Sequence, residues 1–126
     1  MTDAIPTLSD WGLTEPYPWP PGYDEAWAFH MFYGRPLSYI QNRIENNSYE
    51  CAEAFFYIPD NIGQFYFPAF VDYLMSERSR GDDEAAHNFL YTIKQSPGIF
   101  TNCPPATLHR IRSAIDHVER NLAWYD

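Results

Sequence analysis

One stretch of sequence decides the fold of this chain: Gln64-Phe-Tyr-Phe-Pro-Ala-Phe-Val-Asp-Tyr-Leu-Met75. Its aromatic residues suit a β-strand, but Pro68 cannot donate a ladder hydrogen bond and suits the first turn of a helix. On a helical wheel the segment has one apolar stripe with apolar flanks, made by Phe67, Phe70, Val71 and Leu74 and flanked by Tyr66, Tyr73 and Met75. An arc this wide predicts a helix that is covered on most of its circumference, at the centre of the fold.

Helical patterns continue on both sides of this segment. Start and stop signals, with apolar residues spaced by three and four, predict further helices over 24–33, 36–44, 49–57 (capped by Ser48, with Phe55 and Phe56 on its core face), 82–96 and 105–124. The last has the clearest apolar stripe, made by Leu108, Ile111, Ile115, Val118 and Leu122. Residues 99–104 are expected to form a loop. We predict an all-α fold, a compact single-domain bundle of five or six helices over residues 23–126.

Residues 1–22 are expected to form an irregular arm. Prolines fix φ and push the preceding residue to extended geometry, and this segment contains Pro6, Pro16, Pro18, Pro20 and Pro21. Trp11, Tyr17 and Trp19 are interleaved with them. Such an arm either packs over the domain or is held out as a polyproline-like ligand. We favour packing, because exposing these large aromatic side chains would promote aggregation.

The chain is acidic, with 17 Asp and Glu against 8 Lys and Arg. The imbalance lies mainly in residues 1–60, which hold nine acids and two bases. The only lysine is Lys94, so no basic stripe is available for a phosphate backbone. The composition argues against nucleic-acid binding and favours a cationic partner.

The sequence also predicts a compartment. Residues 1–12 have no basic residue and no continuous apolar run, unlike a secretory signal. The longest apolar stretch, residues 65–71, is far shorter than the ~20 residues that span a bilayer. We expect a cytoplasmic protein that is not bound to a membrane, with Cys51 and Cys103 as reduced thiols.

Catalytic and metal-binding patterns are weak. Ser113 and Asp116, with either His109 or His117, suggest a hydrolytic triad, but all of them lie on one predicted helix. Asp83 and His87 share a helical face without a further ligand set. Cys103 precedes a helix, yet Pro104 and Pro105 lack the N–H groups that would stabilise a thiolate. We predict no enzymatic activity, no metal and no cofactor.

An acidic, tyrosine-bearing surface is the strongest functional candidate. Carboxylates pair with Arg and Lys in charge-assisted hydrogen bonds, and Tyr and Trp anchor interfaces at low entropic cost. The predicted partner-binding residues are Trp19, Tyr23, Asp24, Glu25, Tyr49, Glu50, Glu53, Tyr57, Asp60, Asp82, Asp83 and Glu84. Tyr49, Glu50, Glu53 and Tyr57 are expected to share one helical face.

Three segments carry a resemblance: Ala54-Phe-Phe-Tyr-Ile-Pro59, Phe65-Tyr-Phe-Pro-Ala-Phe-Val-Asp-Tyr-Leu74, and Phe100-Thr101 before an amphipathic helix. Over residues 35–122 the chain resembles a small uncharacterised bacterial domain family with a Tyr-Tyr-Phe/Leu-Pro-Ala-Phe core motif, of the kind that includes immunity proteins. The resemblance implies a fold and brings no catalytic residues. The chain departs from the family at Cys103-Pro-Pro, which replaces a polar helix start, and in its proline-rich arm.

Resemblance and charge together favour a stoichiometric inhibitor that neutralises a toxin by filling a basic cleft. The partner would then be a basic protein. The alternative is a structural or adaptor domain that self-associates, for example as a homodimer, through aromatic surface. An enzyme centred on Cys103 or on the His109, Asp116 and His117 face is a third reading.

Overall fold

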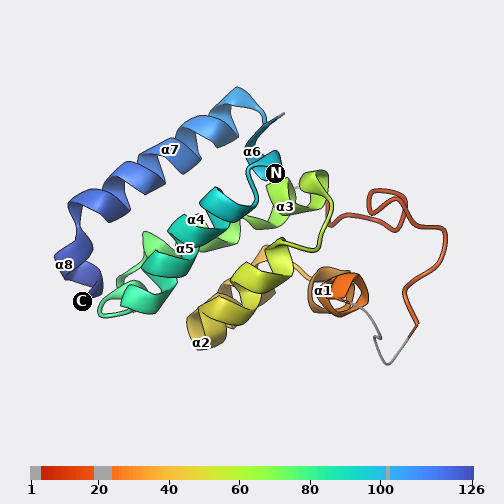
Figure 1. Cartoon of the computed structure of the whole chain (residues 1–126), viewed down its shortest axis with the longest axis horizontal. Helices are drawn as coiled ribbons and strands as arrows, with labels where there is room; N and C mark the ends of the chain where they lie inside the picture. Colours follow the sequence, from red (N-terminus) through yellow and green to blue (C-terminus); the bar gives the residue numbers. More distant parts are fainter. Residues whose placement is uncertain (1–3, 19–23, 102) are drawn as a thin grey trace.

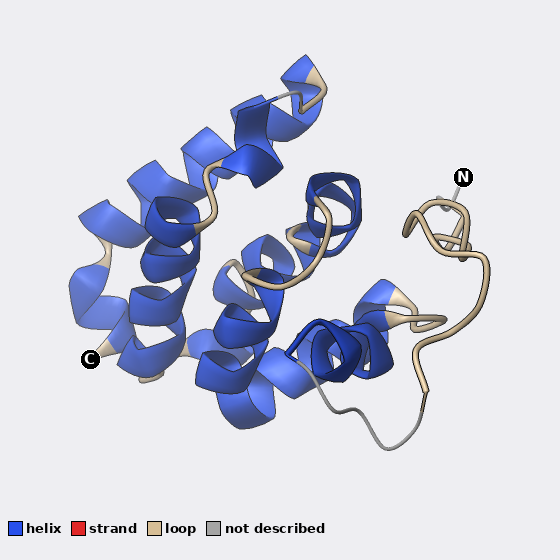
Figure 2. Cartoon of the chain, turned by 45° about the vertical axis from the view of Figure 1, so that its right-hand side comes forward, coloured by secondary structure: helices blue, strands red, loops and turns tan. Residues whose placement is uncertain are grey.

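The structure of the protein is a computed structural model, which describes residues 4–18, 24–101 and 103–126. Within these ranges the regular secondary structure is helical throughout (Figures 1 and 2). The elements are α1 (Asp24–Phe32), α2 (Leu37–Phe55), α3 (Asp60–Tyr66), α4 (Pro68–Leu74), the 3-10 turn η1 (Glu77–Ser79), α5 (Asp83–Gln95), α6 (Gly98–Thr101), α7 (Pro105–Arg120) and α8 (Leu122–Tyr125). The predicted all-α fold is confirmed. No helix of the described ranges has both the length and the apolar character needed to cross a membrane.

Helix α4 lies at the centre of the fold, as the sequence predicts. Pro68 occupies its first turn, and the helix packs against α2, α3, α5 and α7. All four residues of the predicted stripe are buried: Phe67, Phe70, Val71 and Leu74. The Phe67 ring stacks on Phe89 of α5, with ring centroids 5.4 Å apart. In Figure 1, α7 runs along one side of the molecule and α1 lies at the other, with α2, α4 and α5 between them.

Helix α2 joins the two helices that were predicted over 36–44 and 49–57. A kink separates its halves at Asn47, where φ is −159° and ψ is 82°. Asn47, and not Ser48, caps the second half, because the Asn47 Oδ1 accepts a hydrogen bond from the Glu50 N–H at 3.1 Å. The Ser48 hydroxyl is instead buried against α5, where it accepts a 3.0 Å hydrogen bond from Asn88. At this kink, the buried hydrogen bond between Ser48 and Asn88 links α2 to α5.

The later boundaries differ from the prediction in two places. Helix α6 lies in the segment expected to be a loop, and it packs closely on α3. A Cβ at Gly63 would come within 2.7 Å of the Ile99 Cγ1, so glycine allows this approach. The helix predicted over 105–124 ends early, as α7, at Arg120. The Asn121 side chain donates to the His117 carbonyl at 2.7 Å in place of a continuing turn.

Because the helix breaks at Asn121, α8 turns a different residue toward the core from the one that the sequence predicts. Leu122, predicted to continue the apolar stripe, is 59% exposed. Tyr125 is buried in its place, and its hydroxyl donates to the Leu74 carbonyl at 2.8 Å. The apolar spacing in the sequence continues through Leu122, but α7 ends at Arg120, so Leu122 does not reach the core.

The described part of the arm packs on the domain. Trp11 is buried and meets Phe29 edge-on, with ring centroids 5.0 Å apart. Tyr17 meets the same ring at 5.4 Å, and Asn61 donates to the Asp10 carbonyl at 2.7 Å. Packing is therefore confirmed for Trp11 and Tyr17, while Trp19 lies outside the described residues.

Candidate partner-binding surface

Acidic residues gather where the start of α1 meets the end of α2. Asp24 and Glu25 form the exposed first turn of α1, which packs against α2. The pKa of Tyr57 is raised above its ordinary value, first by the negative charge of Asp24 and also by the charges of Glu53 and Glu25. Because α1 packs on α2, Asp24 and Glu25 share one electrostatic environment with Glu53 and Tyr57. We name these four residues the α1/α2 acidic cluster.

The carboxylates of this cluster have no basic partner within the described ranges. Among these residues the ion pairs are Arg43 with Glu50, Arg78 with Glu45, Arg110 with Asp72, and Arg120 with Asp116. None of them includes Asp24, Glu25 or Glu53. The negative field of the cluster is therefore not neutralised within the part of the chain that the structure describes.

Two exposed aromatic side chains adjoin the cluster along the chain. Tyr49 is 56% exposed and lies one helical turn before Glu53. Phe56 is 55% exposed, and its ring meets that of Tyr57 with centroids 5.4 Å apart. The wheel placed Phe56 in the core, which is wrong: Phe56 keeps helical dihedral angles, φ −66° and ψ −25°, and lies two turns after exposed Tyr49 on the same side. The seven-residue spacing from Tyr49 could have identified Phe56 as surface.

Glu50 belongs to a different environment from Glu53. Its carboxylate forms an ion pair with Arg43 and accepts a 3.3 Å hydrogen bond from the Asn47 amide. The side chain therefore closes the kink of α2, and its charge is compensated. Glu50 and Glu53, both predicted to bind a partner, therefore differ in whether a base already compensates their charge.

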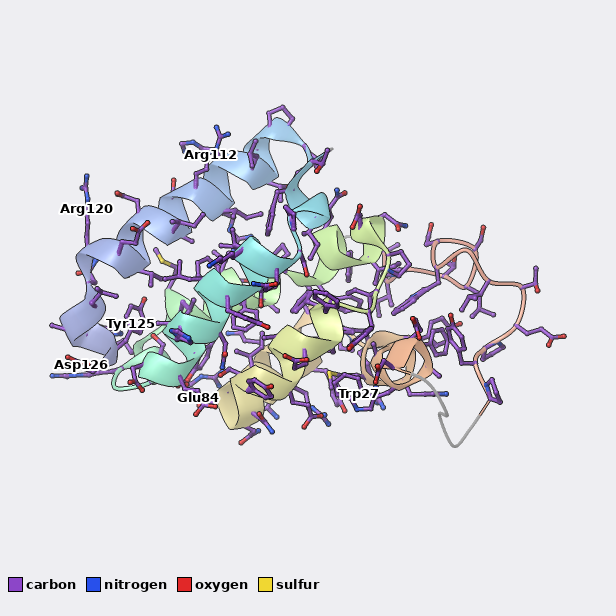
Figure 3. The ribbon with its side chains drawn as sticks, in the orientation of Figure 1. Trp27, Glu84, Arg112, Arg120, Tyr125 and Asp126 are labelled. Carbon is purple, nitrogen blue, oxygen red and sulfur yellow. The ribbon has the colours of Figure 1, made fainter. Side chains whose placement is uncertain are left out.

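The start of α5 contains the second predicted acidic group. The Asp82 Oδ1 accepts the Ala85 N–H at 3.0 Å, and its Oδ2 accepts the Tyr73 hydroxyl at 2.6 Å. Asp82 is thus a helix cap tied to the core. Desolvation and this hydrogen bond raise the pKa of Tyr73. Asp83 and Glu84 remain exposed at this end of α5, and α2 lies between them and α1 (Figure 3).

The remaining predicted residues are Asp60, Trp19 and Tyr23. The Asp60 carboxylate lies against the start of α6, where a Cβ at Gly98 would come within 2.6 Å of its Oδ2. Trp19 and Tyr23 lie outside the described residues. The structure therefore unites Asp24, Glu25, Glu53 and Tyr57 among the predicted residues, and it leaves Tyr49 exposed one turn away.

The candidate catalytic residues show ordinary structural environments. Burial raises the pKa of the Cys51 thiol to about 12, and desolvation also raises the pKa of Cys103. Both shifts oppose thiolate formation, which a cysteine nucleophile needs. Asp116 pairs with Arg120 on the same helix. Within the described ranges no group of three or more His, Cys, Asp or Glu side chains is arranged to hold a metal ion.

Comparisons of the chain with protein-family models, with curated proteins and with solved structures give no significant match. The motif resemblance therefore stays a prediction.

Proposed function

We propose that this chain is an acidic binding protein of the immunity type, which neutralises a basic toxin by filling its cleft. One observation supports the proposal above the others. Where α1 packs on α2, the three carboxylates of Asp24, Glu25 and Glu53 all raise the pKa of Tyr57, and none of them takes part in an ion pair of the described residues. Binding of a partner that supplies cations to such a surface is therefore favourable.

The gain has two physical sources. Like charges held close together repel one another, and an Arg or Lys from a partner turns this repulsion into charge-assisted hydrogen bonds of about 1.5–3 kcal/mol each. The uncompensated field also speeds the encounter with a positively charged protein. Both effects weaken as salt is added.

Aromatic side chains would supply the apolar part of the contact. Tyr49 and Phe56 are more than half exposed, and Tyr57 carries a hydroxyl within the acidic cluster. Large, stiff side chains beside charged groups are typical of interface anchors. A toxin that cleaves or modifies nucleic acid holds its polyanionic substrate in a basic cleft. An acidic and aromatic surface would compete for that same cleft.

The test begins with capture of a partner from extracts of the source cell on the immobilised chain. The captured protein should be basic, should form a 1:1 complex and should lose its toxicity in that complex. With the purified partner, stopped-flow association is then compared for the wild type and for Asp24→Lys combined with Glu53→Lys. We expect association at least ~10-fold slower and less sensitive to salt, as loss of steering predicts.

A matched control separates this site from net charge. Glu77→Lys combined with Glu119→Lys makes the same change in charge at two exposed positions outside the cluster. It should slow association by less than about threefold, because distant charges are screened at physiological salt. Equal effects of the two double variants, or no effect of either, would contradict the proposed surface.

Self-association is the second candidate, and the exposure of Tyr49 and Phe56 favours it. A two-fold dimer through this face would bring two acidic clusters toward each other, which opposes the contact. Sedimentation velocity at low micromolar concentration decides between the candidates. A tight dimer that Phe56→Ser dissociates would support the adaptor reading.

A further inference from the structure

A second surface feature lies between α5 and α8, apart from the α1/α2 acidic cluster. It is a pocket of about 600 Å³, a size within the usual range for binding pockets. Its apolar lining comes from Ala86, Leu90, Leu122 and Tyr125. Figure 3 shows Tyr125 on α8 at the same end of the molecule as Glu84, which lies in the first turn of α5.

The polar part of the lining is mainly acidic. Asp83, Glu84 and Asp126 contribute carboxylates, His87 contributes an imidazole, and neither Lys nor Arg is among the residues that line the pocket. In the ion pairs of the described residues these three carboxylates take no part. The pocket therefore combines an apolar lining with uncompensated acids.

Helix stability accounts for only part of this arrangement. Acidic residues suit the first turn of a helix, and Asp83 and Glu84 would stabilise α5 even if nothing bound there. Asp82, however, already caps that helix through its hydrogen bond from Ala85. Leu122 is 59% exposed and adds apolar surface to the same pocket. The helix dipole accounts for the acids of the pocket and not for the joining of these acids to apolar surface.

Complementarity defines what can fill the pocket. Carboxylates beside apolar surface suit a side chain with an apolar stem and a cationic end, as Arg and Lys have. Leu90 and Leu122 suit an apolar side chain next to that cation. A purely apolar ligand would leave the carboxylates desolvated and unpaired, at a cost in free energy. A purely ionic ligand would leave the apolar lining in contact with water.

We propose that this pocket is a docking site for a protein segment in which an Arg or Lys adjoins a bulky apolar residue. The proposal rests on the proposed function in that such a segment belongs to the basic partner. It adds a second, separate anchor on the opposite side of α2 from the acidic cluster. Binding through two sites on one chain strengthens a complex beyond either site alone.

The pocket can be tested without the partner. The full chain, labelled with ¹⁵N, is titrated with the peptide Ac-Leu-Arg-Leu-NH₂ and observed by NMR. We expect saturable shifts of the amide signals of residues 83–90 and 122–126. Two peptides serve as controls, Ac-Leu-Gln-Leu-NH₂ and Ac-Ser-Arg-Ser-NH₂, and each should bind at least ~10-fold more weakly, since it lacks one half of the complementarity.

Variants of the chain locate the effect. Asp83→Asn combined with Glu84→Gln, and separately Leu122→Ser, should each weaken the arginine peptide by about fivefold or more, which corresponds to ~1 kcal/mol. The matched control is Asp24→Asn combined with Glu25→Gln, which removes the same two charges from the first turn of α1. It should leave the affinity of the pocket for the peptide within twofold. Unchanged amide spectra away from the substitutions verify that each variant is folded.

The possible outcomes separate this proposal from the proposed function. Equal binding of the glutamine peptide, shifts confined to the α1/α2 acidic cluster, or the same affinity in all variants would overturn the docking pocket. Any of these results would leave the inhibitor proposal standing if the captured partner is still neutralised. If the peptide binds at the pocket but the extract contains no basic partner, the docking pocket stands and the inhibitor proposal is overturned.

Discussion

Helices α1 and α5 both begin with acidic residues, yet the fold uses these residues in different ways. At the start of α5, Asp82 accepts hydrogen bonds from the Ala85 backbone and from the Tyr73 hydroxyl. At the start of α1, Asp24 and Glu25 raise the pKa of Tyr57 together with Glu53, and they form no ion pair among the described residues. The first carboxylate stabilises the fold, whereas the second group concentrates charge at the surface.

The difference teaches which acids are available to a partner. A carboxylate that already accepts two hydrogen bonds gains little from a new cation, because binding must first replace those bonds. A carboxylate near others of the same sign gains from any cation that approaches. Net charge does not distinguish these cases, but the hydrogen-bond partners do.

The largest expected effect concerns Asp82. Asp82→Ala should lower the free energy of unfolding by about 2 kcal/mol, because α5 loses its cap and the Tyr73 hydroxyl keeps only a 3.3 Å hydrogen bond to the Arg78 carbonyl. Urea denaturation measures this change. Asp83→Ala, one residue later and exposed, is the control and should cost no more than ~0.5 kcal/mol. Similar costs for both variants would remove the distinction between cap and surface acid.

A smaller effect separates two acids of α2. Glu50→Gln should cost about 0.5 kcal/mol, because Arg43 loses its ion-pair partner at a site that is only partly buried. Glu53→Gln should change stability by less than ~0.3 kcal/mol and can even raise it, because it relieves repulsion from Asp24 and Glu25. Thermal unfolding of the two variants in parallel gives the comparison. A larger loss for Glu53→Gln would show that its charge is compensated in the fold.

The smallest expected effect is a change in one pKa. Nearby negative charge disfavours the phenolate form of Tyr57 and so raises its pKa. Asp24→Asn removes the largest contribution, so the pKa of Tyr57 should fall toward the ordinary value for tyrosine. The ¹³Cζ signal of Tyr57, followed by NMR through alkaline pH, measures it. The same substitution should leave the pKa of Tyr73 unchanged, and an equal fall at Tyr73 would indicate a general loss of structure.

Much of the fold could be predicted from local signals. The Phe67 to Leu74 stripe and the proline in its first turn gave the central helix, since apolar periodicity and a fixed φ act over a single turn. The acids before Ala85 gave the start of α5. The ends of helices were harder to predict, because Asn47 and Asn121 end or restart a helix through side-chain hydrogen bonds that the apolar pattern does not contain.

The candidate site was predictable only in part, for a related reason. Tyr49, Glu53 and Tyr57 follow from their spacing along α2, but the approach of Asp24 and Glu25 depends on how α1 packs. The pocket between α5 and α8 had no local signal at all. It exists because the chain breaks at Asn121 and leaves Leu122 outside while Tyr125 turns inward.

The sequence by itself determined the helical class, the central helix and the surplus of negative charge, because periodicity, proline and composition are local properties. The tertiary structure alone decided which carboxylates remain uncompensated and where apolar surface stays exposed. Both outcomes depend on contacts between segments far apart in the chain, such as α1 with α2 at the acidic cluster and Tyr125 with Leu74 beside the pocket. Identical side chains therefore become a helix cap, an ion-pair partner or free surface charge according to what packing brings beside them.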